Sequence, residues 1–85
     1  MRITESMINK KVEELNNKFY NELGDFKFEY SKSFKFSKLY MIDVETNFID
    51  ESFIIPDNMT TRELYYFMSG VLLSNNLQSF IKFVK

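Results

Sequence analysis

The chain has 85 residues, of which 45% are hydrophobic and 18% aromatic, and its formal net charge is −1 at pH 7. Because it contains neither cysteine nor histidine, disulfides and zinc sites are excluded. The slightly negative charge disfavours duplex DNA as a partner, since phosphate binding needs a surplus of lysine and arginine. With no bilayer-spanning apolar run and no repeat or linker, the sequence predicts a single cytoplasmic domain, residues 1–85, without membrane contact.

Residues 4–23 predict an amphipathic α-helix. Its apolar side chains recur at steps of three and four residues, at Ile8, Val12, Leu15, Phe19 and Leu23. Thr4 precedes this stripe and is expected to cap the N-terminus of the helix. Gly24 follows it and is expected to end the helix in a left-handed backbone conformation.

Residues 26–44 change to a period of two, which predicts strands buried on one face. A series of large apolar side chains falls on even positions, at Phe26, Phe28, Tyr30, Phe34, Phe36, Tyr40, Ile42 and Val44. The segment 31–33, with the sequence SKS, is the best place for a turn between two strands. Residues 53–56, FIIP, predict a short third strand closed by Pro56.

A second helix is expected to start at Thr60, because Thr60 and Glu63 have the spacing of a capping box. Its buried stripe is then expected to consist of Leu64, Met68, Val71 and Leu72, and the polar residues 74–76 are expected to kink or end it. The predicted fold is α+β, a small antiparallel three-stranded sheet packed against an N-terminal and a C-terminal helix in the order α-β-β-β-α.

The residue types leave little for catalysis, since histidine and cysteine are absent and no glycine-rich phosphate loop is present. We therefore expect no enzyme activity, no catalytic residue, no cofactor and no metal site. One acidic run is a candidate protein-binding surface that would meet a basic channel, although its spacing matches no calcium loop and solvated turn residues are the simpler interpretation. Its members are Asp43, Glu45, Asp50, Glu51 and Asp57.

Residues 26–38, FKFEYSKSFKFSK, combine rings with lysines and have two interpretations. As a single-stranded nucleic-acid site, the rings would stack on bases and the lysines would contact phosphates. As an ordinary strand, the rings would be buried and the lysines solvated. The alternation favours the second interpretation, because it places rings and lysines on opposite faces. The candidate nucleic-acid contacts are Lys27, Lys32, Lys35 and Lys38.

The second helix contains LYYFM at residues 64–68, in which consecutive rings must point both inward and outward. Tyr65 and Tyr66, with nearby Phe80 or Phe83, are equally compatible with two arrangements. They form a protein interface, including that of a homodimer, or they pack against the C-terminal tail of the same chain.

The two helices resemble those of small uncharacterised proteins encoded by phages and mobile elements of Gram-positive bacteria. The shared patterns are an I-T-x-x-M start and a T-x-R-E-L-Y helix. The matching positions are Ile3, Thr4, Met7, Val12, Leu15, Asn16, Thr60, Arg62, Glu63, Leu64, Tyr65 and Gly70. Those proteins carry a glycine-rich hairpin where this chain has a glycine-free one.

The resemblance implies accessory phage cargo, a setting rich in proteins that bind and block host machinery, CRISPR nucleases among them. The leading hypothesis is therefore a non-enzymatic, anti-CRISPR type inhibitor that binds a host nuclease effector in the bacterial cytoplasm. The alternative is a small single-stranded nucleic-acid-binding or regulatory phage protein that uses the lysine and aromatic hairpin.

Overall fold

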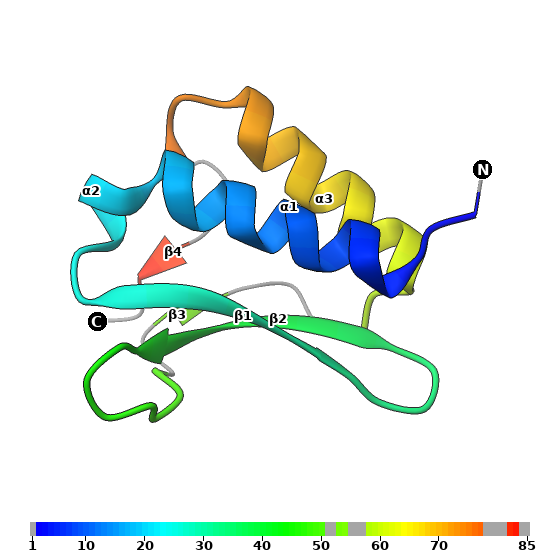
Figure 1. Cartoon of the computed structure of the whole chain (residues 1–85), viewed down its shortest axis with the longest axis horizontal. Helices are drawn as coiled ribbons and strands as arrows, with labels where there is room; N and C mark the ends of the chain where they lie inside the picture. Colours follow the sequence, from blue (N-terminus) through cyan, green and yellow to red (C-terminus); the bar gives the residue numbers. More distant parts are fainter. Residues whose placement is uncertain (1, 51–52, 55–57, 78–81, 84–85) are drawn as a thin grey trace.

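The structure is a computed structural model that describes residues 2–50, 53–54, 58–77 and 82–83. Two long helices lie in one layer, side by side, over a twisted β-hairpin (Figure 1). The elements in chain order are α1 (Glu5–Lys18), α2 (Tyr20–Leu23), β1 (Phe26–Lys32), β2 (Ser37–Asp43), β3 (Phe53–Ile54), α3 (Thr61–Leu73) and β4 (Lys82–Phe83). Among the described residues, no helix combines the length and apolar character needed to cross a membrane.

The N-terminal helix follows its prediction with one interruption. The Thr4 hydroxyl caps α1 by accepting a hydrogen bond from the backbone N–H of Met7, at 3.3 Å. The predicted single helix is interrupted at Phe19, after which α2 adds one further turn. All five residues of the predicted apolar stripe are buried. Gly24 ends α2 with a φ of 61°, a value that other residues rarely adopt.

The second long helix begins with the predicted capping box. The backbone N–H of Glu63 donates to the Thr60 hydroxyl at 3.2 Å, and the backbone N–H of Thr60 donates to the Glu63 carboxylate at 2.9 Å. Leu64, Met68 and Val71 are buried as expected, whereas Leu72, also predicted for the stripe, is half-buried. The helix ends at Leu73, just before the polar residues 74–76.

The capping box predicts an acid-sensitive contribution to stability. Hydrogen bonds from the backbone and then the side chain of Thr60 lower the pKa of Glu63. Because the pKa of Glu63 is lowered in the folded chain, the ionised carboxylate stabilises the fold at pH values above its ordinary pKa of 4.5. This stabilisation is lost as the pH falls through the lower pKa of the folded state. We expect the melting temperature of Glu63→Gln, which does not titrate, to fall less between about pH 5 and about pH 3 than that of the wild type. The exposed Glu13→Gln is the control, and equal acid sensitivity of wild type and Glu63→Gln would contradict the prediction.

The predicted three-stranded sheet is wrong. β1 and β2 form a two-stranded antiparallel sheet, and β3 pairs instead with β4 near the C-terminus. The physical reason is that backbone groups on the second edge of β2 are already bonded to nearby loops. The N–H of Asp43 donates to the Phe48 carbonyl at 3.0 Å, and the N–H of Ser37 donates to the Met59 carbonyl at 2.7 Å. No continuous edge is left on β2 for β3.

The predicted buried face of the hairpin is also wrong for β2. The turn lies at residues 33–36, closed by the Ser33 N–H and the Phe36 carbonyl at 3.0 Å, and not at 31–33. The register pairs even positions with odd ones, such as Phe28 with Met41. Directly paired residues share a face, so the odd positions of β2 point toward the helices and the even ones point away. Of the predicted even series, Phe34, Phe36 and Val44 flank β2 and are exposed, at 94%, 40% and 47%. Ile42 within β2 is nevertheless buried, beside Ile49.

The core lies between the helix layer and the hairpin. Phe28 of β1 and Leu39 and Met41 of β2 pack against the buried stripes of α1 and α3. The side chain of Asn16 on α1 bonds the backbone of Phe28 twice: its Oδ1 accepts from the N–H at 2.7 Å, and its Nδ2 donates to the carbonyl at 3.2 Å. This amide replaces a neighbouring strand at the free edge of β1.

Candidate functional site

The acidic run does not form one continuous acidic surface among the described residues. The Asp43 carboxylate accepts hydrogen bonds from the backbone N–H groups of Glu45 and Thr46, at 2.8 and 3.3 Å, so it holds the turn that follows β2. Glu45 is exposed, whereas Asp50 is half-buried beside β2. Glu51 and Asp57 lie outside the described residues. Asp43 thus has a structural role at the end of the hairpin.

The turn after β2 carries exposed apolar residues that the sequence pattern did not single out. Phe48 is 76% exposed and Ile49 is 60% exposed. Asn47 has a φ of 63°, which reverses the chain and brings Ile49 beside Ile42 of β2. The surface around this turn is therefore mixed, with apolar side chains next to the carboxylates.

The four candidate lysines are distributed over the hairpin. Lys27 on β1 forms an ion pair with Glu29 at 3.4 Å. Lys32, Lys35 and Lys38 are exposed at and beside the turn, where Phe34 and Phe36 are exposed as well. The structure therefore brings lysines and rings together at this end of the hairpin, an arrangement that regular alternation had argued against.

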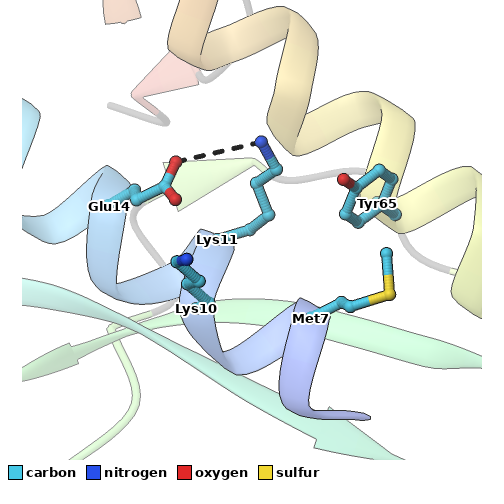
Figure 2. A pocket seen from close by; sticks show the side chains of 5 residues that line it. All are labelled: Met7, Lys10, Lys11, Glu14 and Tyr65. Carbon is cyan, nitrogen blue, oxygen red and sulfur yellow. Dashed lines mark ion pairs between the residues drawn. The ribbon is translucent and has the colours of Figure 1, made fainter. Parts of the chain in front are cut away.

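The two candidate tyrosines of α3 have different environments. Tyr65 is half-buried against the core and lines a pocket of about 280 Å³ between α1 and α3, together with Met7, Lys10, Lys11 and Glu14. In Figure 2 the Lys11 side chain extends between Glu14 and the Tyr65 ring, with its Nζ 3.8 Å from Glu14 Oε2 and 5.3 Å from the ring centroid. Lys11 therefore already interacts with two residues that line the same pocket, Glu14 and Tyr65.

Tyr66 points outward from the helix layer. Its side chain is 51% exposed and contacts the Tyr65 ring edge to face, with centroids 5.7 Å apart. The Arg62 guanidinium lies over the Tyr66 ring at 5.7 Å, one helical turn earlier. Leu73 is 87% exposed two turns later and falls on the same side of the helix as Arg62 and Tyr66. We call these three residues the α3 stripe.

Arg62 and Leu73 were not among the predicted site residues, but the spacing contains a signal for them. Positions 62, 66 and 73 recur on one side of a 3.6-residue helix, opposite the buried Leu64, Met68 and Val71. The same helical periodicity, applied to the outer face of the helix as well as to the inner one, would have identified the α3 stripe. Phe83 belongs to β4, and Phe80 lies outside the described residues.

Within residues 2–50, 53–54, 58–77 and 82–83, no group of three or more acidic, cysteine or histidine side chains is placed to hold a metal ion. Some of the acidic and basic groups described above hold turns, cap a helix or lie on rings, and others are exposed. The exposed surface therefore combines aromatic, apolar, cationic and acidic side chains.

Comparison with known proteins gave no match: no family model, no curated protein and no solved structure matched the chain.

Proposed function

We propose that the chain is a non-enzymatic phage or mobile-element protein that acts by binding a host protein in the bacterial cytoplasm. The observation that carries the proposal is the α3 stripe, formed by Arg62, Tyr66 and Leu73 on the outer face of a well-anchored helix. Tyrosine and arginine are enriched at the energetic centres of protein interfaces. An 87% exposed leucine beside them adds apolar area that a partner would bury.

The geometry favours a pre-organised contact. The ring of Tyr66 is held from one side by Tyr65 and covered by Arg62, so little side-chain freedom remains to be lost on binding. The helix itself is fixed by its capping box and by three fully buried residues. A blocking protein needs a rigid scaffold and a complementary surface, and both are provided here.

The proposed class of partner rests on the sequence resemblance of the two helices. The resemblance of both helices to phage and mobile-element proteins supports a target in host defence, and we propose a CRISPR nuclease effector. Binding by the α3 stripe would inhibit such an enzyme by covering a surface that it needs for its substrate or for assembly. The acidic carboxylates exposed on the hairpin side are not required for this contact.

Tyr66→Ala is expected to weaken binding to the target by roughly 30-fold, because truncation of a central interface tyrosine costs about 2 kcal/mol. The tagged protein is used to recover partners from a nuclease-treated lysate of a CRISPR-bearing Gram-positive host, and the recovered effector is then tested for DNA cleavage with and without the protein. Tyr20→Ala is the matched control, since Tyr20 is another exposed tyrosine, at 73%, on α2.

Loss of both binding and inhibition in Tyr66→Ala, with Tyr20→Ala unchanged, supports the proposal. Wild-type affinity in Tyr66→Ala would reject the α3 stripe as the contact. Sedimentation of the purified protein separates a host-protein surface from a homodimer surface. A dimer that Tyr66→Ala converts to monomers would show that the stripe serves self-association.

A further inference from the structure

The hairpin face that points away from the helices carries rings and a lysine in one row. Ser37, Leu39 and Met41 are fully or almost fully buried against the helices, so the intervening positions of β2 point outward. These positions are Lys38, which is exposed, and Tyr40, which is half-buried, and the same alternation continues to Phe36 before the strand. At about 3.3 Å per residue, Phe36 and Tyr40 are roughly 13 Å apart with Lys38 between them.

The side chains of the neighbouring strand β1 do not cover this row. Ser31 is paired with Lys38, and the small serine makes room for a hollow of about 210 Å³ lined by Ser31, Lys38, Tyr40 and Ile49. Glu29 lies opposite Tyr40, but Lys27 neutralises its charge through the ion pair at 3.4 Å. The Tyr40 ring and the Lys38 side chain therefore border the same hollow.

The turn extends this surface to the end of the hairpin. Phe34 is 94% exposed and Lys35 is next to it, in a turn closed by the Ser33 N–H and hydroxyl, which both donate to the Phe36 carbonyl. Figure 1 shows the turn projecting away from the helix layer at one end of the molecule. From residue 30 to residue 42 the chain contains three lysines and no acidic residue, although the net charge of the whole chain is −1.

We propose that this face binds single-stranded nucleic acid. The proposed site, which we call the hairpin strip, consists of Phe34, Lys35, Phe36, Lys38 and Tyr40. Bases stack on the rings and the backbone phosphates pass beside the lysines. The charge of the strip is complementary to a polyanion, and rings that alternate with a lysine along a strand match a ligand that alternates bases with phosphates.

A single strand fits better than a duplex. Stacking on a side chain requires the free face of an unpaired base, which a duplex does not offer. The two lysines of the strip are also few for duplex DNA, whose affinity depends on a larger surplus of positive charge. The strip shares no residue with the α3 stripe, so this site is independent of the proposed function.

The test is fluorescence anisotropy of a labelled oligo(dT) 12-mer and of a duplex of equal length, titrated with the intact protein. The 12-mer is expected to bind more tightly than the duplex. Phe36→Leu and Tyr40→Leu keep an apolar side chain but remove the ring, and each is expected to weaken binding by about 5- to 150-fold. Tyr20→Leu, which removes an exposed ring on α2, should leave the affinity unchanged.

The salt dependence tests the lysines. With two phosphates neutralised, the affinity for the 12-mer is expected to fall roughly 7-fold between about 50 and about 200 mM salt. Lys38→Gln should reduce the slope of log affinity against log salt by about 0.7, whereas the exposed Lys10→Gln on α1 should not change it.

Three results would overturn the proposal. They are no binding of the 12-mer at low salt, binding that the ring variants do not weaken, and binding instead to vesicles of phosphatidylserine and phosphatidylcholine. The last would assign the strip to an anionic membrane surface. Because Phe34 is 94% exposed, Phe34→Ala tests a ring of the strip without disturbing the core, and circular dichroism verifies the fold of every variant.

Discussion

Phe28→Ala is expected to lower the free energy of unfolding by about 3 to 5 kcal/mol, the usual cost of removing a fully buried phenylalanine ring. Phe28 is 1% exposed and lies in the middle of β1, where it packs under the helices beside Met41. Domains of this kind are stable by about 5 to 15 kcal/mol, so the variant should be near the limit of folding. Urea denaturation followed by circular dichroism measures the loss.

Phe34→Ala is the matched control. Both phenylalanines occupy even positions of the same alternating segment, so the sequence pattern alone predicts the same cost for both. Because Phe34 is 94% exposed, we expect its replacement to change stability by less than about 0.5 kcal/mol. Equal losses for the two variants would mean that the hairpin pairs in another register.

Asn16→Ala is expected to destabilise the protein by roughly 2 kcal/mol, because it leaves the N–H and carbonyl of Phe28 without their partner. Both groups lie at the free edge of β1 and are bonded by the Asn16 amide, at 2.7 and 3.2 Å. Hydrogen exchange should also become faster at the Phe28 N–H, which the amide protects. Both effects follow from one side chain that links α1 to the hairpin.

Asn17→Ala controls for the change in helix propensity, since Asn17 is the exposed neighbour on the same helix. It should be neutral or slightly stabilising. Asn16→Asp keeps the acceptor for the Phe28 N–H but places a carboxylate oxygen against the Phe28 carbonyl, so it should also destabilise. An Asn16→Asp variant as stable as the wild type would show that the Nδ2 hydrogen bond contributes nothing.

Much of the helical structure could be predicted because helix signals are local. The caps at Thr4 and at Thr60 with Glu63 involve residues within one turn, and the buried stripes repeat every three or four residues. The same periodicity also contains the α3 stripe, since the outer face of a helix is defined as soon as its inner face is known. Its role in binding remains a proposal.

The hairpin could not be predicted in the same way, because its pattern is compatible with more than one register. An even alternation fits β1, where Phe28 is buried, but it does not describe β2, where the odd-numbered Leu39 and Met41 are buried as well as Ile42. Shifting the turn from residues 31–33 to 33–36 decides which side chains of β2 point outward. The hairpin strip follows from that choice, and the alternation had argued against it.

The sequence by itself determined the two capped helices, their buried stripes and the absence of histidine and cysteine chemistry. Only the tertiary structure decided which strands pair, which face of β2 is covered and which rings are exposed. The physical reason is the range of the interactions involved. Caps and helical stripes depend on neighbours within four residues, whereas strand pairing depends on backbone groups far apart in the chain, such as those that join β3 to β4.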